Sequence, residues 1–122
     1  MSHDIDLVDQ NTGEVLHMGA AFEDGGTYCV GGSDECSLNV TYNYGGMYCN
    51  VFPDEGWTNG AISWLYGKTG AETIDVLRAG VIALGTNRDD DYWASTPGNA
   101  GAALARLLSF ATAHPDGVWR GD

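Results

Sequence analysis

Three consecutive aspartates, Asp89, Asp90 and Asp91, stand out first, because hard cations bind clusters of carboxylate oxygens. Adjacent residues in an extended loop point in different directions, however, and the alternating acids and the glycine of a calcium-binding loop are missing here. The triplet is better explained as a solvated loop close to the start of a helix. We therefore predict no metal site at these residues.

A zinc site is the second chemistry that the residue types permit. Its ligands would be Cys29, Cys36, Cys49 and His17, but no Cys-x-x-Cys pair supplies the usual first half of such a site. Buried or half-buried thiols on strands explain the cysteines better. The odd number of cysteines also argues against a disulfide framework.

Phosphate binding and nucleophilic catalysis are poorly supported as well. The segment Gly67-Lys68-Thr69 resembles the end of a P-loop, but the glycine that must come five positions earlier is replaced by Ile62. Lys68 is then an exposed cation just past a short helix. There is no Gly-x-Ser-x-Gly motif, and His114 precedes a proline, where it suits a helix-end cation better than a base. We expect no catalytic residue and no cofactor, and so not an enzyme.

The distribution of charge is the most informative feature of the chain, whose formal net charge is -12. Residues 1–56 carry ten acids and no Lys or Arg, whereas residues 57–122 carry seven acids and five bases. Charged side chains that alternate with apolar ones on strands collect on the face that contacts water, so we predict one negative surface in the first half. Its acids, the predicted partner-binding residues, are Asp4, Asp6, Asp9, Glu14, Glu23, Asp24, Asp34, Glu35, Asp54 and Glu55.

Such a surface has two explanations. Acidity can serve only solubility or adaptation to high salt. It can also bind a basic protein, since carboxylates on a rigid sheet can occupy a Lys/Arg groove built for nucleic acid and attract it over a long range. Direct binding of nucleic acid is disfavoured, because the chain has only five Lys and Arg residues.

Two further roles stay open. The first is a structural or interaction protein, a homo-oligomer, whose apolar interface uses Trp57, Tyr92 or Trp93. The second is a small-ligand-binding sponge, which needs a pocket with convergent polar groups. Candidate residues for that pocket are Asn39, Asn43, Asn59, Asn87 and Asn99.

Strands joined by glycine-containing turns are expected in the first half. Residues 4–22 suggest one hairpin, and the turn at 31–34 a second one, which would place Cys29 opposite Cys36. A further strand is expected at 47–52, ended by Pro53. In the segment 37–44, alternation predicts a buried face made of Leu38, Val40, Tyr42 and Tyr44.

Helices are expected in the second half. A short one covers 61–66 and ends at Gly67, and a longer one covers about 71–84 and ends at Gly85. Within the longer helix, Gly80 weakens the helix unless close contact requires the missing side chain.

A third helix should begin after Thr96, whose hydroxyl can cap free amides, with Pro97 in its first turn. It ends before the turn at 114–117, after which Val118 and Trp119 should return to the core. Its apolar stripe is Ala100, Leu104, Leu107, Leu108 and Ala111.

Strands followed by helices indicate an α+β fold, in which an N-terminal antiparallel sheet packs against two to three C-terminal helices. At 122 residues the chain should form a single domain, 1–122, with an acidic β half at 1–56 and a helical half at 57–122. The acidic start "MSHDIDLVD" is unlike a secretory signal, and no apolar run approaches the ~20 residues that cross a bilayer. We expect a cytoplasmic protein.

Four segments carry a resemblance: "NVTYNY" at 39–44, "WLYGKTG" at 64–70, "DDDYWASTPGNA" at 89–100 and "HPDGVWRGD" at 114–122. In these segments the chain resembles a group of small acidic proteins of bacteriophages, prophages and mobile elements. The resemblance supplies no catalytic residues. It implies a mobile-element setting, in which small acidic proteins often inhibit nucleic-acid enzymes or defence systems of the host, anti-CRISPR proteins among them.

The leading hypothesis combines the charge with the resemblance. We expect a non-enzymatic inhibitor, present in the cytoplasm of a bacterial host, that uses its acidic β half to bind a basic host or defence protein that handles nucleic acid.

Overall fold

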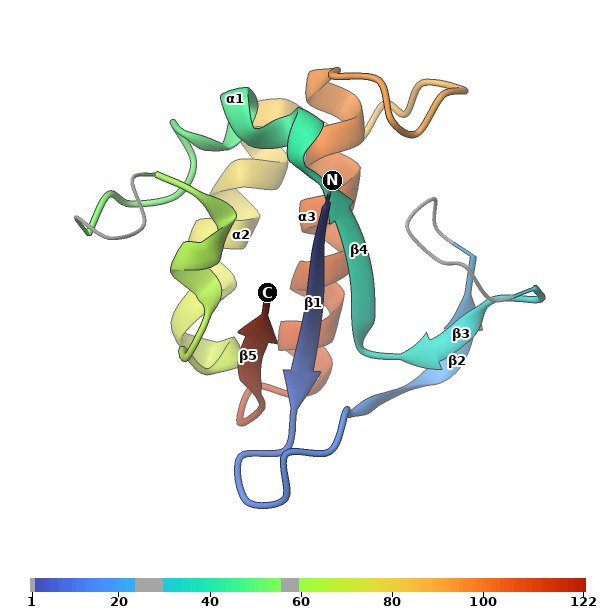
Figure 1. Ribbon diagram of the computed structural model, residues 1–122, viewed down its shortest axis with the longest axis vertical. Helices are drawn as coiled ribbons and strands as arrows, with labels where there is room; N and C mark the ends of the chain where they lie inside the picture. The colour runs from blue at the N-terminus through green and yellow to red at the C-terminus, as the bar shows by residue number, and fades with distance from the viewer. Residues whose placement is uncertain (1, 24–29, 56–59) are drawn as a thin grey trace.

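The computed structural model describes residues 2–23, 30–55 and 60–122, and these form an α+β fold, as predicted (Figure 1). A three-stranded antiparallel sheet has the order β4-β1-β5, and a two-stranded sheet pairs β2 with β3. The strands are β1 (Ser2–Val8), β2 (His17–Phe22), β3 (Ser33–Glu35), β4 (Ser37–Thr41) and β5 (Val118–Gly121).

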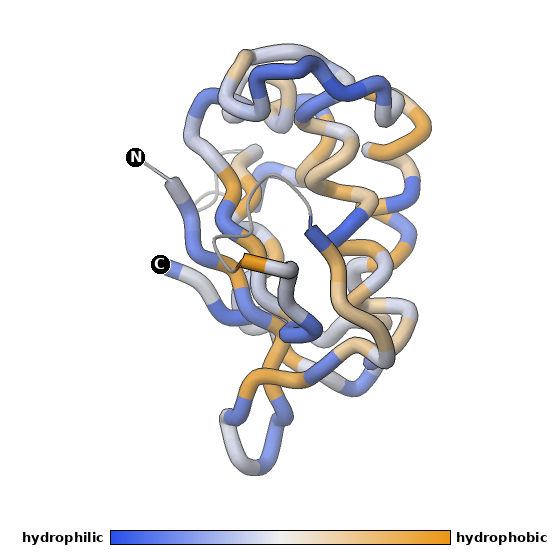
Figure 2. Tube along the Cα trace, turned by 90° about the vertical axis from the view of Figure 1, so that its right-hand side faces the viewer, coloured by the Kyte–Doolittle hydropathy of each residue, from blue (hydrophilic) through white to orange (hydrophobic). Residues whose placement is uncertain are grey.

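Two long helices, α2 (Gly70–Leu84) and α3 (Pro97–Ala113), cover one face of the three-stranded sheet and contact each other. Figure 2 shows the sheet on one side and the helices on the other, with both termini on the side of the sheet. Three short segments complete the fold: η1 (Tyr42–Tyr44), α1 (Gly45–Tyr48) and η2 (Ile62–Leu65). Over the residues described, no helix has the length and apolar composition that crossing a bilayer requires.

Strand β1 occupies the centre of the three-stranded sheet. Its residues Ile5 and Leu7 have no exposed surface, while the alternating residues Asp4 and Asp6 lie on the opposite face. On the neighbouring strand β5, Trp119 is 1% exposed and its indole N–H donates to Thr73 Oγ1 at 2.8 Å. The return of the C-terminal segment to the core is therefore confirmed. Because β5 pairs with β1, the predicted helical half contributes a strand to the sheet of the predicted β half.

The predicted hairpin over 4–22 is only partly present. The chain turns after β1, with one bridge between Val8 and Val15, but β2 then leaves and pairs with β3. The physical reason is that β4 and β5 already occupy both edges of β1. Strand β2 and strand β3 form an arm that extends from one side of the three-stranded sheet (Figure 1). Cys29, predicted to lie opposite Cys36, falls outside the described residues.

The strand predicted at 47–52 is wrong, because this region begins with the helix α1. Tyr44, Tyr48 and Phe52 are spaced four residues apart, which places them on one side of a helical segment. All three are buried, at 0%, 2% and 3% exposure, with ring centroids 6.1 Å apart for the first pair and 5.6 Å for the second. Tyr42, predicted to be buried, is instead 45% exposed.

The predicted helices are confirmed. Thr69 and Glu72 form a reciprocal capping box at the start of α2, and Gly85 ends this helix with φ 74°. At the start of α3, the Thr96 hydroxyl accepts a hydrogen bond from the Asn99 amide at 3.1 Å, and Pro97 occupies the first turn. The short helix predicted at 61–66 is the 3₁₀ segment η2.

Glycines allow the two long helices to approach closely. A Cβ at Gly80 would lie 2.7 Å from both Leu104 Cδ1 and Val51 Cγ1, so close contact does explain this helical glycine. At Gly101 a Cβ would overlap the backbone carbonyl of Gly85, which cannot move aside without shifting the end of α2.

Replacing Gly101 with alanine should therefore lower the free energy of unfolding by about 3 kcal/mol, because the added methyl group meets backbone. The matched control is Gly46→Ala in α1, where a Cβ has no neighbour within 4 Å. That substitution should raise the free energy of unfolding by up to about 1 kcal/mol through helix propensity. Urea denaturation of both variants measures the difference, and a stable Gly101→Ala variant would contradict the close approach of the helices.

Candidate functional site

The face of the three-stranded sheet that is turned away from the helices carries a regular set of polar side chains. Asp4 pairs with Asn39 across β1 and β4, and Asp6 lies between Ser37 on one side and Arg120 on the other. Because side chains alternate along a strand, Asp4 and Asp6 project from the same face. Two of the predicted acids thus lie side by side on a regular strand.

Hydrogen bonds hold these carboxylates in defined orientations. Asn39 Nδ2 donates to Asp4 Oδ1 at 2.7 Å, and Ser37 Oγ donates to Asp6 Oδ1 at 2.6 Å. Arg120 Nη2 lies 3.2 Å from Asp6 Oδ2, so one guanidinium partly neutralises this face. Asp4 is exposed, and its carboxylate is fixed through a neutral amide instead of a cation.

Asp122 extends this surface, and further acids lie in the turn after β1. Asp122 Oδ1 accepts a hydrogen bond from the Asp4 amide at 2.9 Å. Asp9 accepts from the amides of Asn11 and Thr12, and these bonds lower the pKa of its carboxyl group. Arg120 Nη1 donates to the Gly13 carbonyl at 3.2 Å, which ties the turn to β5. We call the group Asp4, Asp6 and Asp122 the acidic sheet face, and Asp9 and Glu14 belong to the turn that follows β1.

The other predicted acids do not lie on the acidic sheet face. Asp34 and Glu35 are exposed on β3 and Glu23 follows β2, so these three belong to the arm at one side of the sheet (Figure 1). Asp34 lies 3.2 Å from His17 Nδ1 within this arm. Asp24 falls outside the described residues.

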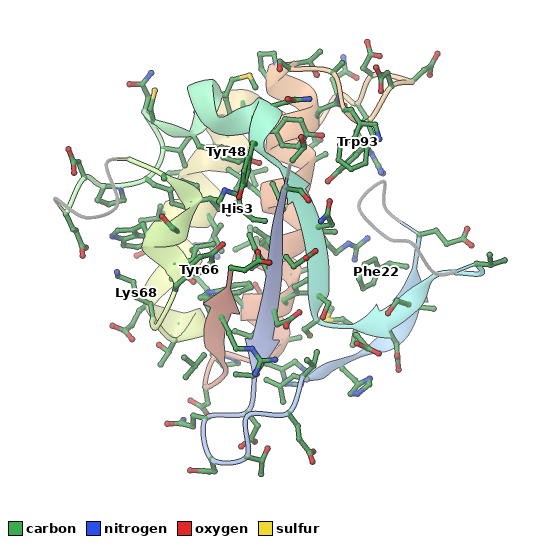
Figure 3. All side chains as sticks on the ribbon, in the orientation of Figure 1. His3, Phe22, Tyr48, Tyr66, Lys68 and Trp93 are labelled. Atoms are coloured by element: carbon green, nitrogen blue, oxygen red, sulfur yellow. The ribbon has the colours of Figure 1, made fainter. Side chains whose placement is uncertain are left out.

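Asp54 and Glu55 lie on the opposite side, next to η2. Glu55 accepts a hydrogen bond from Trp64 Nε1 at 2.6 Å and lies 3.5 Å from Lys68 Nζ. In Figure 3, the label of Lys68 marks the side of η2 and the label of Phe22 marks the side of the arm. The structure therefore distributes the predicted acids over separate groups, and the acidic platform is narrower than the single surface that the charge pattern suggested.

The basic residues already interact within the chain. Arg78 pairs with Asp75 at 3.5 Å, and the Arg106 guanidinium lies 4.3 Å from the Phe22 ring centroid. Lys68, predicted to be exposed, has only 21% of its side chain exposed because it lies over the Trp64 ring at 4.4 Å. Arg88 has an interaction as well. Exposed carboxylates thus exceed the cations that could neutralise them.

A pocket lies at the N-terminal end of β1, between this strand and the segment that leads into η2. Its volume is about 350 Å³. His3, Tyr48 and Tyr66 appear together there in Figure 3. The described residues that line it, which we call the His3 pocket, are His3, Thr41, Tyr42, Gly45, Tyr48, Cys49, Gly60, Ala61 and Ile62.

The polar groups around the His3 pocket are connected to the acidic sheet face. His3 Nδ1 lies 3.2 Å from Tyr66 Oη and 3.3 Å from the Asp122 carbonyl oxygen. Burial and, second, the charge of Asp122 raise the pKa of Tyr66 to about 12, so this hydroxyl stays protonated near neutral pH. Sequence reasoning missed the pocket, although the four-residue spacing of Tyr44, Tyr48 and Phe52 could have revealed the helical wall beside it.

Of the candidate zinc ligands, Cys29 falls outside the described residues, and Cys36, Cys49 and His17 lie on different elements. Cys36 is buried between β3 and β4, where burial and then the charge of Asp34 raise the pKa of its thiol to about 11. Cys49 is an exposed thiol at the end of α1. His114 Nε2 lies 2.6 Å from the His17 carbonyl and so joins the end of α3 to β2. In the described ranges, no group of three or more His, Cys, Asp or Glu side chains could hold a metal ion.

The aspartate triplet at 89–91 belongs to a tightly organised turn. Asp89 and Asp91 accept hydrogen bonds from the amides two residues later, at 2.9 and 3.0 Å. Asn99, which is fully buried, accepts from the Asp89 amide and donates to the carbonyls of Asp91 and Ala94. Of the asparagines proposed to line a ligand pocket, Asn99 therefore serves to hold this loop, and Asn59 falls outside the described residues.

Replacing Asn99 with alanine should lower the free energy of unfolding by about 2–4 kcal/mol, since it leaves buried backbone groups without partners. The matched control is Asn87→Ala, an exposed asparagine of the same loop, which should change stability by less than about 0.5 kcal/mol. Thermal and urea denaturation measure both. Equal stabilities of the two variants would contradict the role given to Asn99.

No protein-family model, curated protein or solved structure matches this chain. Its function is therefore inferred from its own residues and their geometry.

Proposed function

We propose that this chain acts by binding and not by catalysis, as an inhibitor that docks its acidic sheet face onto a basic protein that handles nucleic acid. The observation that carries the proposal is the pair of carboxylates at Asp4 and Asp122, which hydrogen bonds hold in place on the acidic sheet face. The cations of the chain have partners within the chain, so they leave these carboxylates available. Rigid carboxylates lose little conformational entropy when a partner binds.

The overall charge favours a basic partner of this class. With 17 acids and five bases, the chain attracts Lys/Arg-rich surfaces and repels phosphates. A groove that binds nucleic acid presents Lys and Arg along its length to contact phosphates, and carboxylates can take their place. A host enzyme or defence protein, CRISPR effectors included, is the target expected if the chain comes from a phage or mobile element.

The test is a charge-neutralising pair on the acidic sheet face. Asp4→Asn with Asp122→Asn keeps the Oδ1 acceptors of both hydrogen bonds but removes two negative charges. Proteins captured from a bacterial lysate by the immobilised chain are identified by mass spectrometry, and the purified partner is titrated with each variant. We expect the affinity for the partner to fall about tenfold at low salt, and the difference to shrink as salt rises.

A control pair with the same change in charge is Asp75→Asn with Asp90→Asn, two exposed acids on α2 and on the 86–96 loop. Its affinity should stay within about twofold of the unmodified chain, because distant charges contribute only through the screened net field. Equal losses in the two pairs, or a partner that does not bind nucleic acid, would refute the proposal.

A homo-oligomer is the second candidate, favoured by large apolar side chains at the surface. Trp93 is 41% exposed and Ile82 is 77% exposed. Sedimentation at about 0.05 M and about 0.5 M NaCl separates the two functions, because apolar association persists or strengthens with salt whereas acidic docking weakens. We expect a monomer at both concentrations of salt, and a dimer that persists at high salt would favour the oligomer.

A further inference from the structure

The His3 pocket and the acidic sheet face meet at the N-terminal end of β1. His3 lines the pocket, and the next residue, Asp4, projects from the open face of the sheet. Asp122 contacts both, through its side chain to the Asp4 amide and through its carbonyl to His3. His3 and Asp4 project from opposite faces of β1, so the pocket and the carboxylates are reached together only around the end of this strand. A partner segment that passes around this end can contact the carboxylates and enter the pocket.

The walls of the pocket present apolar and aromatic surface. The Tyr48 hydroxyl donates to the Ala100 carbonyl at 2.9 Å and is thus engaged with α3, and both Tyr48 and Ile62 border the pocket with only 2% of their surface exposed. Tyr42, 45% exposed, adds an aromatic ring that makes an edge contact with His3, with ring centroids 4.6 Å apart. Such a lining suits an aromatic group.

Gly45 suggests that the pocket is kept open at a cost in stability. Its backbone is helical, with φ -54° and ψ -39°, a conformation that any residue adopts. A Cβ there would have no neighbour within 4 Å, so no close contact requires the glycine. Alanine would favour the helix by about 1 kcal/mol, whereas a larger side chain at this lining position would take up space in the pocket.

Charge limits the groups that can enter. Among the described residues that line the pocket there is no Lys or Arg, and the charges of Asp122 and Asp4 contribute to the raised pKa of Tyr66 beside it. A phosphate or carboxylate would be repelled there. A neutral aromatic ring flanked by cations would gain affinity from the apolar pocket and from the carboxylates of the acidic sheet face.

We propose that the His3 pocket receives an aromatic side chain of the basic partner, with Lys or Arg residues on either side of it contacting Asp4 and Asp122. This inference rests on the proposed function. It adds an apolar centre to an otherwise charged contact, which is the arrangement in which a buried aromatic side chain contributes most of the affinity.

The experiment compares two capped peptides, Lys-Lys-Trp-Lys-Lys and Lys-Lys-Ala-Lys-Lys, by NMR titration of the isotope-labelled chain at low salt. We expect the tryptophan peptide to bind at least about tenfold more tightly and to shift the amide signals of pocket residues. Because Cys49 is an exposed thiol that lines the pocket, the same peptide should also slow its alkylation by iodoacetamide, measured by mass spectrometry of the Cys49 peptide.

Two variants of α1 test whether the tryptophan side chain binds in the His3 pocket. Gly45→Leu should fill the pocket and abolish the difference between the two peptides. Gly46→Leu is the matched control, since Gly46 is equally open but does not line the pocket, and it should keep the difference. Protection of Cys49 in the unmodified chain is measured independently of whether the Gly45→Leu variant folds.

The outcomes separate this inference from the proposed function. If both peptides bind equally, and the Asp4→Asn, Asp122→Asn pair weakens both, then the acidic sheet face stands and the pocket inference is overturned. Changes in NMR signals that centre on Trp93 instead of the pocket residues would also overturn the pocket inference. If neutralising Asp4 and Asp122 leaves the binding of both peptides unchanged, the proposed function fails.

Discussion

Strand β1 is hydrogen-bonded along both edges, to β4 on one side and to β5 on the other, and this double pairing determines the rest of the structure. It requires the last strand of the chain to lie beside the first. The register with β5 then sets Arg120 next to Asp6 and brings Asp122 to the Asp4 amide. Apolar burial on the other face drives the same arrangement, because Ile5, Leu7 and Trp119 are almost fully buried under the helices.

The acidic sheet face and the His3 pocket are both consequences of that pairing. Carboxylates on a central strand cannot move independently of the sheet, so Asp4 and Asp6 present charge with little loss of entropy on binding. The pocket forms where β1 begins, because α1 and the segment at 60–62 border this end of the strand. The arm of β2 and β3 contributes its own acids at a separate place and is attached to α3 through Phe22, whose ring centroid lies 5.5 Å from that of Phe110.

The sequence predicted best what local chemistry determines. The starts and ends of α2 and α3 followed from Thr69, Gly85, Thr96 and Pro97, since capping depends on residues a few positions apart. The pairing of β1 was not predictable in this way, because alternation shows which face is buried but not which strand lies alongside. Helix α1 was missed because the segment 47–52, ended by Pro53, resembles a strand, whereas the buried rings of Tyr44, Tyr48 and Phe52 follow a helical spacing. The sequence shows which residues of the first half are acids, but their distribution over separate groups depends on the path of β2, which no local pattern specifies.

Footprinting of carboxyl groups tests the central claim most directly. The chain is labelled with a carbodiimide and an amine, alone and in complex with its captured partner, and the modified positions are determined by mass spectrometry. We expect the partner to protect Asp4 and Asp122, while Asp75 and Asp90 react equally in both samples. Protection confined to Asp34 and Glu35 on the arm, with Asp4 and Asp122 still fully reactive in the complex, would contradict the account.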